Sequence, residues 1–396
     1  MLNKNNIREL AYVAEIKSID PIIGSDNCES ATIDGWHVMV KKGTFKVGDK
    51  CVYFEIDSKL DTTKPMFAFL EKCKGKIKTQ RYTFGGKGNF ISQGLIMSLE
   101  ECELDYDKYN VGDFLTEKLG VVYAEEEDNK RKSNDRPQYK SSFNKIKKNK
   151  IVKYLMKFGW FRKVIFAIYG VHKKKKNYPW FVIKSDEERC QNIPQSVFDN
   201  KEHTYEVTEK IDGTSSTYAI ERIHTNKYQV YICSRNVVVF DGKKIKEGGY
   251  YKDIENPYMA SDKQYNILMS LTDYMNNHKD VKWCYLQGET FGNHIQKRDY
   301  GLKETDFRAF TFVDSTRPRY TYSEMKNILD NYNIPTVPIK QIGFILPDNC
   351  DELLKIAGDK SDIDGGMREG IVLRNEKDPQ FSFKAVDNEF ILKYHG

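Results

Sequence analysis

The sequence predicts an α+β protein in which a small β-barrel precedes a larger domain built on antiparallel sheets. Three observations support this prediction. Residues 1–123 contain short β-rich runs that are separated by turn signals. Residues 124–150 interrupt that pattern with an acidic run at 125–128 and then a Lys-, Asn- and Ser-rich stretch, and residues 151–171 are richer in apolar and aromatic residues. Residues 178–396 alternate β-rich runs with segments of helical periodicity, so we expect three regions with these boundaries.

The first region has the spacing of a small barrel. Its β-rich runs cover residues 38–40, 51–56 and 94–97. Glycine-containing turn signals lie between them, at residues 23–26, 42–43, 47–49 and 85–88. Several short strands at such intervals are typical of closed or partly closed antiparallel sheets.

The second region concentrates the positive charge of the chain. Between Lys130 and Lys176 there are 17 Lys and Arg residues and one acid, Asp135, although the whole chain carries only +6. The remaining residues are therefore acidic overall. A basic segment of this kind either contacts phosphate backbone or is a solvated linker, and both interpretations stay open. We interpret residues 151–171 as a connecting helix, with a membrane-surface or nucleic-acid helix as the alternative.

The third region supplies most of the regular structure. The expected caps are Thr321 or Ser323 for one helix and Asp348 for another. Helices are expected at residues 262–277, 322–331 and 349–357. Strands are expected at residues 215–220, 228–233, 283–288, 308–313 and 370–374.

Composition excludes several classes of protein. Aromatic residues make up 13% of the chain and charged residues 30%, which is typical of globular proteins and not of disordered ones. The eight cysteines are scattered without a C-x-x-C pair, which disfavours a zinc or redox motif and favours the cytoplasm or another reducing intracellular compartment. No run of 18 apolar residues and no signal peptide is present, so we expect no integral membrane segment.

The segment most suggestive of chemistry contains a lysine before an Asp-Gly turn. Lys210 follows a β-rich run and precedes Ile211, Asp212 and Gly213. A lysine amine becomes a nucleophile when burial or a nearby cation lowers its pKa. Taken alone, these four residues are as well explained by an exposed lysine in an ordinary turn.

An ordered set of polar residues downstream changes that assessment. Glu289 and Glu369 are each next to a glycine, which lets a ligand approach the backbone, and carboxylates bind ribose hydroxyls or hydrated divalent ions. Arg235 and Lys384 supply cations for phosphate oxygens. Phe310 offers a flat face to a purine, although strand alternation explains a core residue there equally well. Each of these residues also has an ordinary structural explanation.

In combination and order, these segments resemble the covalent nucleotidyltransferase superfamily of ligases and capping enzymes. The similarity includes the segment before the lysine and the β-rich region that precedes it. It is closest to ATP-dependent RNA ligases of the Deinococcus and Naegleria type, which carry an N-terminal OB domain. The segments that carry the resemblance are residues 209–214, 234–236, 286–292, 307–312, 368–374 and 381–386.

Two features set the chain apart within this resemblance. Residues 125–177 are longer than the corresponding part of that family. Other branches have Lys-x-Lys in the last segment, whereas this chain has Ser382, Phe383 and Lys384. Lys393 is therefore a second candidate for the phosphate-binding lysine. Only three residues follow Lys393, so we expect no OB domain after the catalytic region.

The resemblance implies an OB-like barrel in residues 1–123, a linker or helical insertion in 124–177, and an ATP-grasp-like ligase domain in 178–396. It implies ATP as the cofactor and Mg²⁺ or Mn²⁺ as the metal, with nicked duplex RNA ends as the expected substrate. Nothing in the sequence indicates an obligate protein partner. The implied catalytic residues are Lys210, Asp212 and Lys384. The implied nucleotide-binding residues are Glu209, Gly213, Arg235, Glu289, Phe310, Glu369, Lys384 and Lys393, with Glu369 also supporting the metal.

Three alternatives remain at this point. A nucleotidyltransferase with another acceptor or with GTP, such as a capping enzyme, is disfavoured by the lack of a following OB domain. A DNA ligase would not require a ribose at the 3′ end. A non-catalytic nucleic-acid-binding protein is disfavoured because a lysine, arginine or carboxylate occupies each position that the chemistry uses.

Overall fold

The computed structural model describes residues 8–86, 89–124, 150–155, 157, 165, 178–185, 187–225, 227–242 and 256–394. By its contacts the chain divides into two units, one made of Met1–Val121 with Tyr178–Gly396 and the other of Val122–Asn177. The predicted boundaries at residues 123 and 178 stay a prediction. Most of the basic segment 130–176 lies outside the described residues, which include the short helix α4 (Lys150–Leu155).

The N-terminal domain consists of short antiparallel strands around one aromatic core. Trp36, Tyr12 and Tyr53 are each at most 1% exposed and pack with aliphatic side chains from both of its three-stranded sheets. One sheet has the order β1-β5-β9 and the other β2-β3-β4, and β7 pairs with β8. The strands are β1 (Ala11–Glu15), β2 (Ser18–Pro21), β3 (Cys28–Ile33), β4 (Trp36–Lys41), β5 (Lys50–Phe54), β6 (Ser58–Lys59), β7 (Gln80–Thr83), β8 (Asn89–Ser92) and β9 (Leu95–Met97). The short strand β10 (Val122–Tyr123) belongs to the second unit. The helical turns are η1 (Pro65–Cys73), η2 (Tyr106–Lys108) and α1 (Thr116–Leu119).

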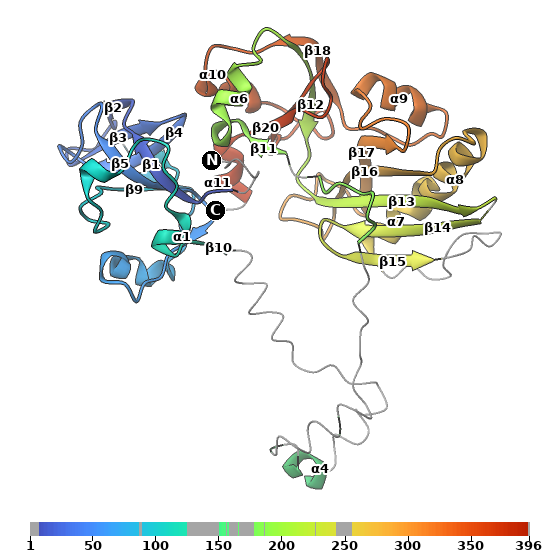
Figure 1. Ribbon diagram of the computed structural model, residues 1–396, viewed down its shortest axis with the longest axis horizontal. Helices are drawn as coiled ribbons and strands as arrows, with labels where there is room; N and C mark the ends of the chain where they lie inside the picture. Colours follow the sequence, from blue (N-terminus) through green and yellow to red (C-terminus); the bar gives the residue numbers. More distant parts are fainter. Residues whose placement is uncertain are drawn as a thin grey trace. The chain divides into compact units, whose positions relative to one another are not determined.

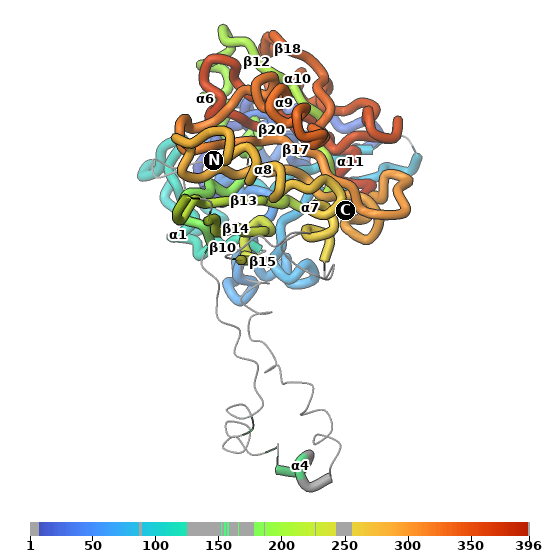
Figure 2. The backbone as a smooth tube through the Cα atoms, turned by 90° about the vertical axis from the view of Figure 1, so that its right-hand side faces the viewer, coloured from blue at the N-terminus to red at the C-terminus, as the bar shows by residue number. Residues whose placement is uncertain are grey.

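The C-terminal domain is built on two five-stranded sheets, which are seen in Figure 1. The first has the order β11-β20-β19-β12-β18, and β12 lies beside β18 in both Figure 1 and Figure 2. Its strands are β11 (Glu188–Arg189), β12 (Thr204–Lys210), β18 (Ile339–Ile345), β19 (Gly370–Asn375) and β20 (Ser382–Val386). The second has the order β15-β14-β13-β16-β17. Its strands are β13 (Thr214–His224), β14 (Lys227–Ser234), β15 (Val238–Gly242), β16 (Trp283–Gly292) and β17 (Thr305–Asp314).

Helices cover both sheets. The largest core cluster joins β13, β14, β16 and β17 to three of the helices, α7, α8 and α9. A second cluster packs α10 against β12, β19 and β20. The helices of this domain are η3 (Cys190–Asn192), α6 (Pro194–Phe198), α7 (Pro257–Tyr265), α8 (Ile267–Asn277), α9 (Tyr322–Asp330), α10 (Cys350–Ala357) and α11 (Asn388–Tyr394). Among the described residues, no helix has the length and apolar character needed to cross a bilayer.

Two expectations about helix ends need correction. The single helix predicted at residues 262–277 is two helices, because Asn266 adopts a left-handed conformation with φ +51° that ends α7. α7 also begins earlier, since Asn256 accepts a hydrogen bond from the Met259 amide and Pro257 suits the first turn. The cap of α10 is Asn349 and not Asp348. The expected cap at Thr321 is confirmed, and with Glu324 it forms a capping box on α9.

Candidate active site

The turn that carries Lys210 connects the two sheets of the C-terminal domain. Lys210 is the last residue of β12 in the first sheet, and Thr214 is the first residue of β13 in the second. Gly213 is required here, because an added Cβ would collide with the Thr290 carbonyl oxygen and come within 2.9 Å of Glu289 Cγ. The predicted strand–turn context of the lysine is therefore present, and it places the amine where the sheets meet.

The amine of Lys210 lies among carboxylates. Its Nζ is 2.6 Å from Oε2 of Glu369, the residue that immediately precedes β19. Burial alone would lower the pKa of Lys210, but Glu369 and Glu289 outweigh that effect and raise it above its ordinary value. This direction is opposite to the lowered pKa that generally activates a lysine amine as a nucleophile. The ligand-free site instead favours the protonated amine, chiefly because of its ion pair with Glu369.

The pKa of Glu289 is also raised, but here the raised pKa favours the uncharged form of the side chain. Burial raises the pKa of Glu289 to about 8, and Lys210 offsets only part of that rise. At neutral pH this carboxyl is therefore largely protonated, while Glu369 forms the ion pair. A carboxyl with so strongly raised a pKa beside a buried lysine is common at functional sites.

These groups line a cavity of about 300 Å³. Of the residues expected from the sequence, only Lys393 is not part of its lining. That lysine is exposed on α11, with its Nζ 5.0 Å from the ring centre of Tyr394. The residues that line the cavity are Ser185, Glu187, Thr208, Glu209, Lys210, Ile211, Asp212, Gly213, Thr214, Ser215, Arg235, Glu289, Gln296, Phe310, Val337, Glu369, Val372, Arg374 and Lys384.

Glu209 has a carboxylate that is already occupied. It is 1% exposed, and it accepts hydrogen bonds from the hydroxyl of Ser361 and, at 2.8 Å, from the amide of Asp362. These bonds attach the segment that leads to Glu369 to the strand that carries Lys210. The sequence implied a contact between Glu209 and adenine, and the structure adds this second task.

A buried charged cluster at the side of the cavity was not anticipated. Arg319 donates to Glu187 at 3.1 Å and to the hydroxyls of Thr311 and Ser382. Burial opposes ionisation of Glu187, yet Arg319 and Arg374 overcome it and lower its pKa to about 2. Burial next to Arg319 in turn lowers the pKa of Arg374 to about 9. Within this cluster, Glu187 and Arg374 face the cavity.

One sequence signal could have revealed part of this cluster. In β19, Val372 and Arg374 alternate with buried residues, so both point to one face of the sheet. An arginine in a strand that is otherwise apolar is unusual unless it has a partner. Arg374 donates to the backbone carbonyl of Phe310 at 2.7 Å and so supports the strand that carries the predicted stacking residue.

The last predicted segment lies on β20, between β19 and β11. Lys384 is opposite Val372 and Arg189 and lines the cavity. Ser382, where other branches have a lysine, accepts a hydrogen bond from Arg319 at 2.9 Å. An arginine from a different element thus brings positive charge to that position.

The carboxylate oxygens in the cavity suit a hard divalent cation only when a substrate supplies further oxygen ligands. Glu289 and Glu369 are oxygen donors near Lys210, and oxygen ligands are those that Mg²⁺ and Mn²⁺ prefer. In the part of the chain that the structure describes, no group of three or more His, Cys, Asp or Glu forms a metal cluster. Mg²⁺ is commonly held by one or two carboxylates with phosphate oxygens and water, so these residues fit a metal that arrives with a nucleotide.

Comparisons with known proteins agree with this geometry. Residues 203–395 match the RNA ligase family model, and residues 10–99 match an OB-fold domain model. The Naegleria gruberi RNA ligase solved with PPi is 25% identical, has a TM-score of 0.70, and the match covers 98% of this chain and 99% of that one. A variant of that enzyme solved with AMP and Mn is 26% identical, with the same TM-score and coverage. A further variant, solved with ATP and Mn, is 25% identical over the same shares at a TM-score of 0.70. Among curated proteins, a sequence search finds no match.

The fold defines a nucleotidyltransferase with an N-terminal OB-fold domain. Its residues 203–395 match the RNA ligases, and the protein is an ATP-dependent RNA ligase.

Proposed function

We propose that this RNA ligase uses ATP to join 3′-hydroxyl and 5′-phosphate ends at nicks in duplexes, through a lysyl-AMP intermediate at Lys210. The observation that carries the proposal is the Lys210 amine, which faces a cavity lined by acidic and basic side chains. The Naegleria enzyme has been solved with ATP or AMP and Mn, which supports the same nucleotide and a divalent cation here.

The reaction has three steps. The Lys210 amine attacks the α-phosphorus of ATP, which forms a P–N bond and releases pyrophosphate. The 5′-phosphate end then takes AMP from the lysine. The 3′-hydroxyl finally attacks that activated phosphate, forms the phosphodiester and releases AMP. Each step depends on positioning and on neutralising phosphate charge.

The cavity residues divide between base, ribose and phosphate. Phe310 stacks on adenine and Glu209 contacts its edge, while Arg235 and Glu289 contact the ribose. Lys384 contacts the α-phosphate, and Asp212 and Gly213 shape the turn of the nucleophile. A divalent cation held by Glu369 would supply positive charge to the phosphate oxygens. With its carboxylate engaged in this way, Glu369 would no longer hold the proton on the Lys210 amine.

The first experiment tests the covalent step. Incubation with labelled ATP and Mg²⁺ or Mn²⁺ should label the full-length protein, and Lys210→Ala should remain unlabelled. Lys210→Arg should also remain unlabelled, because the guanidinium stays protonated. An adduct that persists in Lys210→Ala would rule out this lysine, and labelling by GTP instead of ATP would indicate a capping-type enzyme.

The second experiment tests the substrate. Nicked duplexes with a ribose or a deoxyribose at the 3′ end should be compared with single-stranded RNA of the same sequence. The proposal requires sealing of the nick with a 3′ ribose in preference to the other two. Equal sealing of the deoxyribose nick would make the protein a DNA ligase as well, and preferred sealing of single strands would overturn the nick assignment.

The eight cysteines are all free thiols, which supports action in a reducing intracellular compartment.

A further inference from the structure

The loop between β16 and β17, residues 293–304, contacts the turn of the nucleophile at two places. The amide of Asp212 donates to the Tyr300 hydroxyl at 2.7 Å. The side chain of Gln296 donates to the Gly213 carbonyl at 3.0 Å. Two of the three residues between β12 and β13 are therefore held by one loop, which the sequence did not suggest as part of the site.

The same loop also holds the segment that leads to Glu369. Arg298 is 4% exposed and donates to the Met367 carbonyl and to the Asp364 carboxylate. Its guanidinium lies over the Tyr300 ring, 3.9 Å from the ring centre. Met367 is two residues before Glu369, so a short chain of contacts through Arg298 and Tyr300 connects the two partners of the Lys210–Glu369 ion pair.

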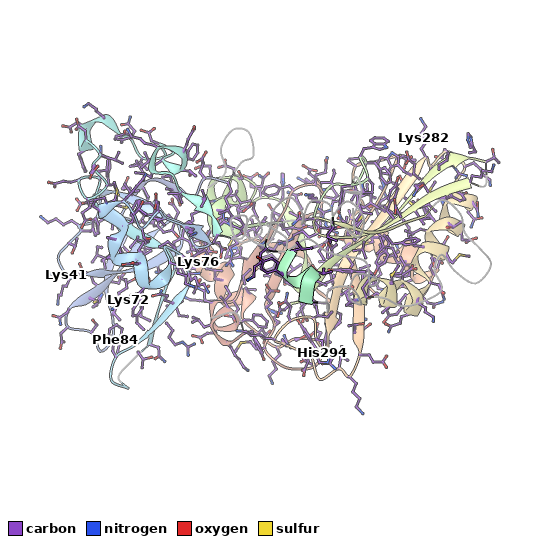
Figure 3. All side chains as sticks on the ribbon, turned by 90° about the horizontal axis from the view of Figure 1, so that it is seen from below. Lys41, Lys72, Lys76, Phe84, Lys282 and His294 are labelled. Carbon is purple, nitrogen blue, oxygen red and sulfur yellow. The ribbon has the colours of Figure 1, made fainter. Side chains whose placement is uncertain are left out.

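The backbone of this loop is constrained. Tyr300 has φ +55°, and His294, which is labelled in Figure 3, has φ +63°. Residues other than glycine seldom adopt this left-handed conformation, and where they do it is commonly near a functional site. Tyr300 is 3% exposed and its ring packs edge-to-face on Phe291, so the position of its hydroxyl is fixed.

We propose that Tyr300 is a positioning residue for the nucleophile, acting with Gln296 and Arg298 as a brace between the Lys210 turn and Glu369. The brace keeps the amine aligned with the α-phosphorus of ATP during formation of lysyl-AMP. It takes no proton from the amine and does not touch the reacting atoms. This inference rests on the proposed function, because it assigns these residues to the first step of that reaction.

The test is Tyr300→Phe, which removes the acceptor of the Asp212 amide and keeps the ring. Single-turnover self-adenylation at saturating ATP should slow by roughly tenfold to a hundredfold, since misplacement of a reacting group by about 1 Å costs that much. The KM for ATP should change little, because no nucleotide contact is removed. Closure of a nick that already carries 5′-AMP should stay near the wild-type rate, because Lys210 is not the nucleophile in that step.

Two further variants make the result interpretable. Tyr228→Phe removes another buried hydroxyl, one that donates to Asn276 at 2.6 Å away from the cavity, and it should leave adenylation unchanged. Gln296→Leu removes the second contact at an exposed position and should slow the same step, even if Tyr300→Phe folds poorly.

The possible outcomes distinguish failure of the proposed function from failure of the positioning role of Tyr300. If the wild-type protein forms no lysyl-AMP, the proposed function fails. If it does, and both Tyr300→Phe and Gln296→Leu adenylate at the wild-type rate, the brace is not needed. Equal losses in adenylation and in closure of the pre-adenylated nick would indicate general loss of structure. A shifted pH–rate profile in Tyr300→Phe would make Tyr300 an acid or base, and would also overturn the positioning role.

Discussion

The Nζ of Lys210 lies 2.6 Å from the Oε2 of Glu369, in a direct ion pair at the junction of two sheets. This pair gives the ligand-free ligase a resting state. In the proposed reaction, the amine that attacks ATP is protonated at rest, and its neighbour is the carboxylate expected beside the metal. Binding of nucleotide and cation therefore has to break one contact before chemistry can begin.

Replacement of Glu369 should affect the chemistry more than the fold. We expect Glu369→Gln to lower the rate of self-adenylation by roughly 100-fold or more, because a charge that organises the phosphate end of the site is lost. Thermal unfolding should show that the variant is folded at the assay temperature. Glu117→Gln makes the same change on an exposed position of α1 and should adenylate normally. A Glu369→Gln protein that is folded and adenylates at the wild-type rate would exclude the metal role.

The raised pKa of Lys210 predicts a pH-dependent first step. The attacking form is the neutral amine, whose share rises about tenfold per pH unit below the pKa. The kcat/KM for self-adenylation, which reports the free protein, should therefore increase steadily between about pH 7 and pH 9. Measurement with limiting ATP and saturating metal tests this. A flat profile over that range would show that the lysine is already neutral before ATP binds.

Glu289 should make the ligand-free protein less stable as pH rises. Folding raises its pKa to about 8, so the folded protein keeps a proton that the unfolded chain releases near the ordinary value. The contribution of the Glu289 carboxyl to the free energy of unfolding is fully present below the ordinary pKa of a glutamate. It is lost as pH rises through about 8. The slope is at most about 1.4 kcal/mol per pH unit.

Urea unfolding without nucleotide or metal, at several values between about pH 5 and pH 8.5, measures this effect. Glu289→Gln cannot titrate at this position and should lack this pH dependence, so the wild type should lose stability relative to the variant as pH rises. Parallel curves for the two proteins would contradict the assigned protonation state of Glu289.

Phe310 should act on nucleotide binding. It is half-buried on β17 and lines the cavity, whereas Phe312 on the same strand is 1% exposed in the core. Loss of a stacked base costs about 1–3 kcal/mol, so Phe310→Ala should raise the KM for ATP by roughly tenfold. Phe312→Ala should instead lower the free energy of unfolding by about 3–5 kcal/mol. An unchanged KM in folded Phe310→Ala would make Phe310 an ordinary packing residue.

Nine residues of the cavity lining could be named from the sequence, because their local signals occur together in one order along the chain. Lys210 precedes an Asp-Gly turn, and Glu289 and Glu369 are unusual acids next to glycines in β-rich segments. These signals depend on neighbours in the chain, and the structure brings all of the residues except Lys393 to one cavity.

Other parts of the site depend on contacts between distant residues. Glu187, Arg319 and Arg374 come from three separate elements, and only the fold pairs them. Tyr300 has no local feature that distinguishes it from a core tyrosine, although its hydroxyl meets the Asp212 amide. β18 was missed because most of its side chains are partly or fully exposed and show no alternation. The direction of the Lys210 pKa shift likewise depends on which charges the fold brings near, and no pattern in the sequence indicates it.

The change of sheet at the Lys210 turn has a mechanical consequence. β12 belongs to one sheet and β13 to the other, and only Ile211, Asp212 and Gly213 lie between them. The two ends of this turn are fixed in different sheets, so the position of the Lys210 amine depends on how the two sheets are placed. In the proposed reaction, the AMP attached to Lys210 would therefore be anchored to both halves of the domain core at once.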